Sequence, residues 1–148
     1  MELTELKHKI DLALNELYSR DSFLLNQNLS EWSIAHRLAV YLEDIIPGWN
    51  VDCEYNRQGQ DADAKKMLDD KKVRPDIIIH RRGLLESEHN LLAVEIKKNN
   101  TESDDDKVCE YTKAPTDHRK FQYKYGLSLS FKPSLKLTWF KDGEALNE

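Results

Sequence analysis

The chain contains few of the residues that build secreted disulfide scaffolds, membrane spans or flexible linkers. Its 148 residues include two cysteines, five glycines and four prolines. Cys53 and Cys109 lack the spacing of a metal-binding pair, so a reducing, cytoplasmic location is the simpler expectation. No apolar run approaches the roughly 18 residues of a membrane span, and the charged N-terminus lacks the apolar centre of a signal peptide. We therefore expect no association with a membrane.

The chain also lacks the positive charge of a protein that coats nucleic acid non-specifically. Its 22 lysines and arginines are outnumbered by 27 acidic residues, which gives a net charge of −5. This balance leaves room for a local basic cleft in a protein that is acidic elsewhere. Charged residues make up 33% of the chain and hydrophobic residues 39%, as in a globular protein. The length suits a single domain over 1–148, in which folding buries roughly 70% of the unfolded chain's surface.

Two apolar runs carry charged residues where a buried strand should have none. Asp76 opens the run 77–79, and Glu95 and Lys97 stand near the end of a second run that begins at Leu91. Side chains alternate between the two faces of a strand, so Glu95 and Lys97 share one face. Buried charges are costly unless they are paired or bind a metal. These three residues are therefore the first candidates for a functional site.

Helical periodicity predicts two helices before these strands. The first lies within residues 1–28, and the second spans about 30–46, with Ser30 as its N-cap. In the second helix Glu31 falls within the apolar stripe, one turn before Ile34. It can point into the protein, or it can simply favour the helix N-terminus electrostatically.

The rest of the chain predicts strands and one more helix. The expected elements are a half-exposed strand at 51–55, a polar loop at 56–73, a helix after Ser103, strands at 121–131 and 135–140, and a tail from Gly143. Helices and strands mixed in this order predict the α/β class, with a mixed central sheet flanked by helices.

If the two focal strands run antiparallel, the start of one lies beside the end of the other. Asp76 then lies close to Glu95 and Lys97. Their carboxylates, with the backbone carbonyl of Ile96, suit Mg²⁺ or Mn²⁺. The Lys97 amine can hold or deprotonate a water, or neutralise charge on a phosphate. His80 lies about 13 Å along the strand from Asp76, at roughly 3.3 Å per residue, and is left out of the site.

The residues Pro75-Asp76, followed by Glu95-Ile96-Lys97, resemble the signature of the PD-(D/E)xK nucleases, the restriction-endonuclease-like superfamily. That family's αβββαβ core would cover residues 30–131, with an extra N-terminal helix and a C-terminal closing strand. The resemblance implies that Asp76 and Glu95 bind the metal and that Lys97 positions the attacking water. Glu31, on the first core helix, would complete the site.

Some members of this superfamily carry Gln-x-x-x-Tyr on the next helix. Here the matching positions are Lys107 and Tyr111, with lysine in place of glutamine. The candidates for contact with nucleic acid are Arg74, Lys98, Lys107 and Tyr111.

The expected function is Mg²⁺-dependent hydrolysis of phosphodiester bonds, in DNA rather than RNA. One alternative is a non-catalytic subunit of the same fold that binds nucleic acid or a protein, in a homodimer or with a partner subunit. Another is a structural domain without metal, in which Asp76 caps a turn and Glu95 pairs with Lys97 on an edge strand. The sequence leaves these alternatives open.

Overall fold

The computed structural model describes most of the chain. The described residues are 1–26, 31–55, 57–58, 61–65, 67–68, 71–72, 74–84, 86–99, 105–117 and 121–147, with the backbone alone between 57 and 72. The expected caps Ser30 and Ser103 lie outside these residues.

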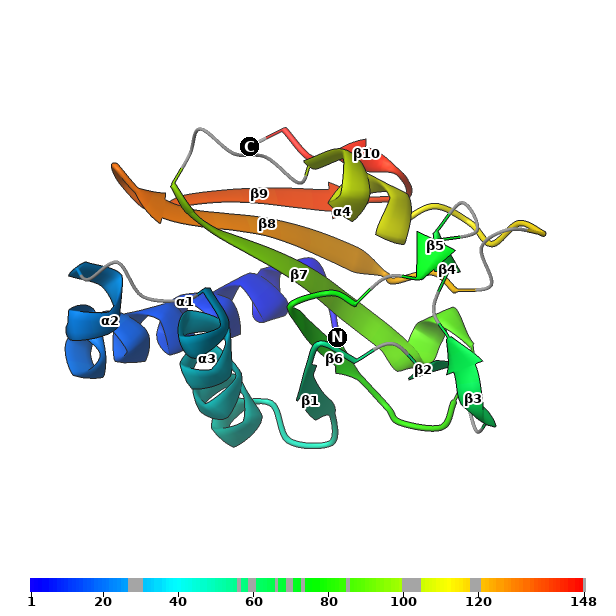
Figure 1. The fold of residues 1–148 in the computed structure, drawn as a ribbon, viewed down its shortest axis with the longest axis horizontal. Helices are drawn as coiled ribbons and strands as arrows, with labels where there is room; N and C mark the ends of the chain where they lie inside the picture. The colour runs from blue at the N-terminus through cyan, green and yellow to red at the C-terminus, as the bar shows by residue number, and fades with distance from the viewer. Residues whose placement is uncertain are drawn as a thin grey trace.

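A mixed six-stranded sheet forms the centre of the molecule (Figure 1). Its strands, in spatial order, are β1 (Asn50–Cys53), β6 (Ile77–His80), β7 (Asn90–Asn99), β8 (Tyr125–Lys132), β9 (Lys136–Lys141) and β10 (Glu144–Ala145). Strands β7 and β8 are parallel, and all other neighbours are antiparallel. The predicted α/β class with a mixed sheet flanked by helices is therefore confirmed.

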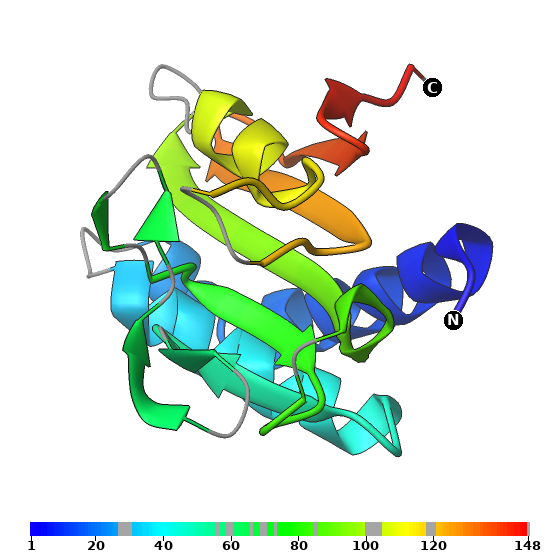
Figure 2. The ribbon, with the colours of Figure 1, turned by 90° about the vertical axis from the view of Figure 1, so that its right-hand side faces the viewer.

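Helices cover both faces of this sheet (Figure 2). The long helices α1 (Leu3–Arg20) and α3 (Glu31–Ile45) pack on one face, with the short α2 (Ser22–Asn26) beside them. Helix α4 (Asp105–Tyr111) packs on the other face, against β7, β8 and β9. A short 3₁₀ turn (Ser87–His89) leads into β7. None of the helices in the described part of the chain combines the length and apolar character needed to cross a bilayer.

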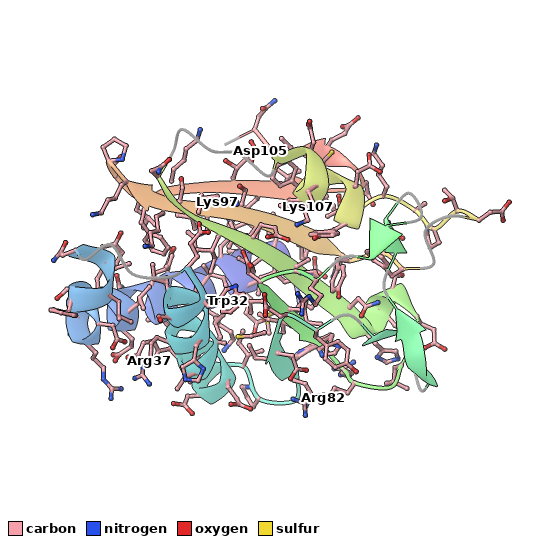
Figure 3. All side chains as sticks on the ribbon, viewed as in Figure 1. Trp32, Arg37, Arg82, Lys97, Asp105 and Lys107 are labelled. Atoms are coloured by element: carbon pink, nitrogen blue, oxygen red, sulfur yellow. The ribbon has the colours of Figure 1, made fainter. Side chains whose placement is uncertain are left out.

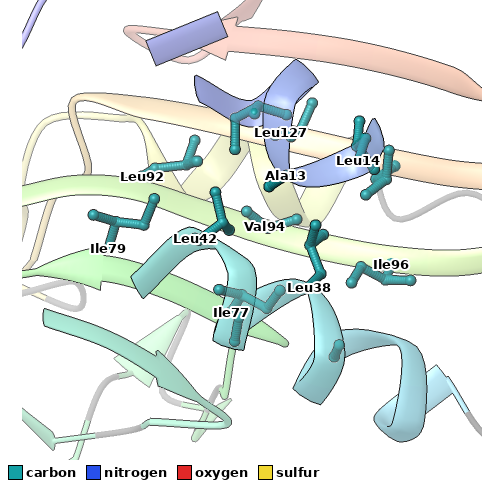
Figure 4. Packing of buried hydrophobic residues seen from close by; sticks show 14 of the residues in the cluster. Ala13, Leu14, Leu38, Leu42, Ile77, Ile79, Leu92, Val94, Ile96 and Leu127 are labelled. Atoms are coloured by element: carbon teal, nitrogen blue, oxygen red, sulfur yellow. The ribbon is translucent and has the colours of Figure 1, made fainter. Parts of the chain in front are cut away.

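The alternation of β7 divides its side chains between the two helical layers. Leu92, Val94 and Ile96 belong to the large core with α1 and α3, where Figure 4 shows them against Leu38 and Leu42. Each buried aliphatic side chain of this kind stabilises the fold by roughly 1.5–3 kcal/mol. The intervening residues of β7, among them Glu95, face α4.

A smaller cluster lies under α4. It consists of Ile78, Ala93, Tyr111, Phe121 and Tyr123. The predicted strand at 121–131 begins only at Tyr125, because the Tyr123 N–H donates to the carbonyl of Tyr111 at 2.9 Å instead of joining the sheet. Both Phe121 and Tyr123 are nevertheless buried.

Three further parts of the chain differ from the expected secondary structure. The predicted loop at 56–73 contains four short strands, paired two by two: β2 (Arg57–Gln58) with β3 (Asp61–Lys65), and β4 (Met67–Leu68) with β5 (Lys71–Lys72). The predicted connection after α1 contains α2, and the predicted tail contains β10. Backbone hydrogen bonds define such short elements, so they carry no periodic apolar pattern that a sequence could reveal.

Candidate active site

Strand β7 extends beyond its neighbour β6, and this overhang creates the site. The pairing of β6 with β7 ends at Ile77 opposite Val94, whereas β7 continues to Asn99. On its other edge β7 remains paired with β8 as far as Asn99 opposite Lys132. The N–H groups of β7 that point to the β6 side beyond Val94 therefore need acceptors other than a strand.

Two of the predicted acids supply these acceptors. Asp76 stands directly before β6, and its Oδ2 accepts a hydrogen bond of 2.7 Å from the Ile96 N–H. Glu31 begins α3, and its Oε2 accepts one of 3.1 Å from the Lys98 N–H. Alternate N–H groups of a strand point to the same edge, so both carboxylates lie along the overhang of β7. The structure thus brings together an acid from a helix and an acid from a strand start.

Glu95 projects from β7 toward α4 and is only 4% exposed. Its Oε1 accepts a hydrogen bond of 2.8 Å from the Tyr111 hydroxyl and lies 3.4 Å from the Lys107 ammonium nitrogen. The carboxylate of Asp76 is close enough to influence the ionisation of Glu95. Glu95 is therefore held by one helix and crowded by a second carboxylate.

This environment favours a proton on Glu95. Burial, and then the negative charge of Asp76, raise the pKa of Glu95 to about 8, although Lys107 and Tyr111 act in the opposite direction. Burial and the neighbouring Glu95 also raise the pKa of Tyr111, so its hydroxyl remains a donor. A positive charge placed next to Glu95 would favour its ionised form and so lower this pKa.

Lys97 follows Glu95 by two residues and shares its face of β7. Lys97 is partly buried, and its paired residue on the neighbouring strand β8 is Ser130. Figure 3 shows Lys97 on β7 and Lys107 on α4. The alternation directs the side chain of Lys98 to the opposite face, while Arg74 is exposed just before buried Pro75. Of the predicted contacts to nucleic acid, Tyr111 is fully buried and binds Glu95.

The donor set fits a metal held by few protein ligands. Among the described residues, no three His, Cys, Asp or Glu side chains form a group that could hold a metal ion. Asp76 and Glu95 form a pair, while Glu31 is bound to the Lys98 N–H. Mg²⁺ commonly uses one or two carboxylates together with waters and substrate phosphates. Asp76 and Glu95 supply this number of carboxylates.

His80 takes part in a separate cluster, in line with its exclusion from the site. Its Nε2 lies 2.7 Å from Asp52 Oδ2, and the same carboxylate accepts a hydrogen bond of 2.8 Å from Arg82 Nε. Burial alone would raise the pKa of Asp52, but the hydrogen bonds from His80 and Arg82 outweigh it and lower the pKa. Sequence reasoning missed the contact of His80 with Asp52, because these residues meet only through the antiparallel pairing of β1 with β6.

Sequence reasoning also missed that Tyr111 and Lys107 hold Glu95. The only signal was their four-residue spacing, which places both side chains on one face of a helix. Comparison with known protein families, with curated proteins and with solved structures gives no match to this chain. The functional argument therefore depends on the geometry of the site.

Proposed function

We propose that this protein is a Mg²⁺-dependent nuclease that hydrolyses phosphodiester bonds, in DNA rather than RNA. The observation that carries the proposal is the buried Glu95 with the partly buried Asp76 close to it, and with Lys97 on the same face of the sheet as Glu95. An acid pair beside an amine is the equipment that metal-assisted phosphodiester hydrolysis requires.

The order of elements supports a restriction-endonuclease-like core. From α3 the chain passes through β1, β6 and β7, then α4 and β8, which corresponds to αβββαβ when the short strands β2 to β5 are treated as an insertion. Helix α1 and strand β9 are then the additions before and after this core. The proposed restriction-endonuclease-like core is supported by this order of elements and by the resemblance of the motif.

Each residue of the site has a distinct role in the proposed reaction. A bound Mg²⁺ would lower the pKa of a water and neutralise charge on the phosphate. Asp76 and Glu95 would bind the ion, together with the carbonyl oxygen of Ile96. The Ile96 N–H orients Asp76, and the Tyr111 hydroxyl orients Glu95. Lys97 would direct the attacking water and stabilise negative charge on the phosphate.

Glu31 has a supporting role in this proposal. Its carboxylate binds the Lys98 N–H and thereby holds the overhanging end of β7 against α3. This contact fixes the strand segment that carries Lys97.

A non-catalytic subunit that binds nucleic acid is the second candidate. The observation that favours it is the position of the Lys107 ammonium, which lies 3.4 Å from Glu95 Oε1, beside the position that a metal would take. The net charge of −5 also favours a partner subunit or a homodimer that extends the binding surface. In such a subunit Asp76, Glu95 and Lys97 would stabilise the fold without catalysing hydrolysis.

A nuclease assay with matched variants separates these functions. The purified protein is incubated with single-stranded, duplex and branched DNA and with RNA, in Mg²⁺ or Mn²⁺. Asp76→Asn keeps an oxygen acceptor for the Ile96 N–H but removes the charge, and Lys97→Ala removes the amine. We expect each to reduce cleavage by roughly 100-fold or more, while Lys136→Ala, at an exposed position on β9, leaves it unchanged.

The outcomes distinguish the three possibilities. Cleavage that survives both Asp76→Asn and Lys97→Ala would show that the site is assigned wrongly. Absence of cleavage on every substrate, with metal binding that is lost in Asp76→Asn, would favour the non-catalytic subunit. Absence of metal binding in the wild-type protein would leave a structural domain.

A further inference from the structure

Helix α4 places two different donors on one oxygen of Glu95. The Tyr111 hydroxyl and the Lys107 ammonium both approach Glu95 Oε1, at 2.8 and 3.4 Å. Tyr111 is fully buried, whereas the Lys107 side chain is 40% exposed. One donor is therefore fixed within the protein, and the other stands at the boundary with solvent.

Close packing of α4 on the sheet fixes the position of these donors. Gly126 of β8 lies beneath the helix, and a Cβ built there would lie 2.6 Å from Val108 Cγ1 and 3.1 Å from Thr112 Cγ2. A side chain at this position would push the helix away from β7. The glycine thus allows α4 to bring Lys107 and Tyr111 within reach of Glu95.

The two donors differ in what a divalent cation would do to them. A neutral hydroxyl can keep its hydrogen bond to a carboxylate that also binds a metal. An ammonium group beside the same carboxylate would be repelled by the ion through a medium of low dielectric constant. Lysine has a flexible four-carbon stem, so its charge can move by several ångströms while α4 stays in place.

We propose that Lys107 is a positioning residue whose ammonium lies against Glu95 in the metal-free protein and moves to a substrate phosphate when the divalent ion binds. This inference rests on the proposed function. In the metal-free state the ammonium lies 3.4 Å from Glu95 Oε1, beside the position of the proposed ion. In the loaded state the same ammonium is at the edge of the site, where a phosphate of the nucleic acid would lie. Tyr111 holds Glu95 in both states.

Direct titration of the metal tests this exchange without any measurement of catalysis. Mn²⁺ is titrated by calorimetry into the wild type, Lys107→Met and Lys107→Arg at low ionic strength. We expect Lys107→Met to bind Mn²⁺ several-fold more tightly, because no ammonium has to be displaced. Lys107→Arg, which keeps the charge, should behave like the wild type, and Lys136→Met controls for a general change in protein charge.

Binding to DNA tests the second half of the exchange. In a Lys97→Ala background with Mg²⁺ present, adding Lys107→Met should weaken duplex binding and reduce the slope of log affinity against log salt by about 1, as for one lost phosphate contact. Lys136→Met in the same background should change neither quantity. Thermal unfolding of each variant shows whether it is folded. If Lys107→Met does not fold, Lys107→Gln is used in its place.

The results separate this inference from the proposed function. A wild-type protein that binds no Mn²⁺ overturns both. A wild type that binds Mn²⁺, with Lys107→Met binding it equally or more weakly, overturns the exchange and leaves the metal site intact. An unchanged salt slope in Lys107→Met refutes the movement to a phosphate.

Discussion

Replacing Glu95 by glutamine should change how the stability of the metal-free protein depends on pH. Glutamine keeps an oxygen that can accept the hydrogen bond from Tyr111, but it carries no charge at any pH. The substitution therefore removes the ionisation of Glu95 and leaves most of its packing unchanged. Its effect measures the cost of ionising Glu95, which arises first from burial and then from the charge of Asp76.

The magnitude follows from the pKa of Glu95. Its value of about 8 in the folded protein lies above the ordinary 4.5 of the unfolded chain. Between these values the folded state binds more protons than the unfolded state, so the free energy of unfolding falls as pH rises. At about 1.4 kcal/mol per pH unit, the full interval corresponds to about 5 kcal/mol. The Glu95 contribution is thus fully present below about pH 4.5 and lost above about pH 8.

Urea unfolding in the presence of a chelator measures this effect. The free energy of unfolding is determined at pH 5 and at pH 9 for the wild type and Glu95→Gln. We expect the advantage of Glu95→Gln over the wild type to grow by roughly 3–5 kcal/mol between the two pH values. Glu43→Gln, at an exposed position on α3, is the control and should stay within roughly 0.5 kcal/mol of the wild type.

A difference between Glu95→Gln and the wild type that stays constant with pH would refute the reasoning. It would show that Glu95 is not buried beside a second charged carboxylate. Addition of Mg²⁺ should reduce the difference, because the ion stabilises the ionised wild-type pair and has less to bind in the variant.

Two further predictions concern helix α4. Tyr111→Phe removes the hydroxyl that donates to Glu95, so we expect the free energy of unfolding to fall by roughly 1–2 kcal/mol. We also expect weaker Mn²⁺ binding by calorimetry, and an unchanged metal affinity would contradict the positioning role of this hydroxyl. Gly126→Ala introduces a Cβ 2.6 Å from Val108, so we expect a loss of roughly 1–3 kcal/mol and a lower metal affinity, as α4 moves away from β7. Ser128→Ala on the same strand is its control, and an equally stable Gly126→Ala protein would show that α4 tolerates the displacement.

Residue patterns predicted the long elements because burial is periodic in them. The apolar stripe predicted for residues 30–46 corresponds to α3. The two apolar runs correspond to β6 and β7, and the alternating pattern corresponds to β8. The short strands β2 to β5 and the strand β10 were missed, because a ladder of two or three residues needs no apolar face.

In the candidate site too, the sequence identified some features and the structure alone revealed others. The alternation of side chains along a strand placed Glu95 and Lys97 on one face, and helical periodicity identified Glu31, so these candidates came from sequence alone. That Glu31 binds the Lys98 N–H, 67 residues away, depends on how far β7 extends beyond β6.

The tertiary structure alone decided the electrostatic state of the site. Tyr111 and Lys107 reach Glu95 because α4 lies close to β8 over a glycine. Asp76 comes near it because β6 and β7 pair antiparallel with Ile77 opposite Val94. A sequence shows which residues can carry charge, but the interaction of two charges depends on their separation and burial. Those quantities arise only when segments distant along the chain pack together.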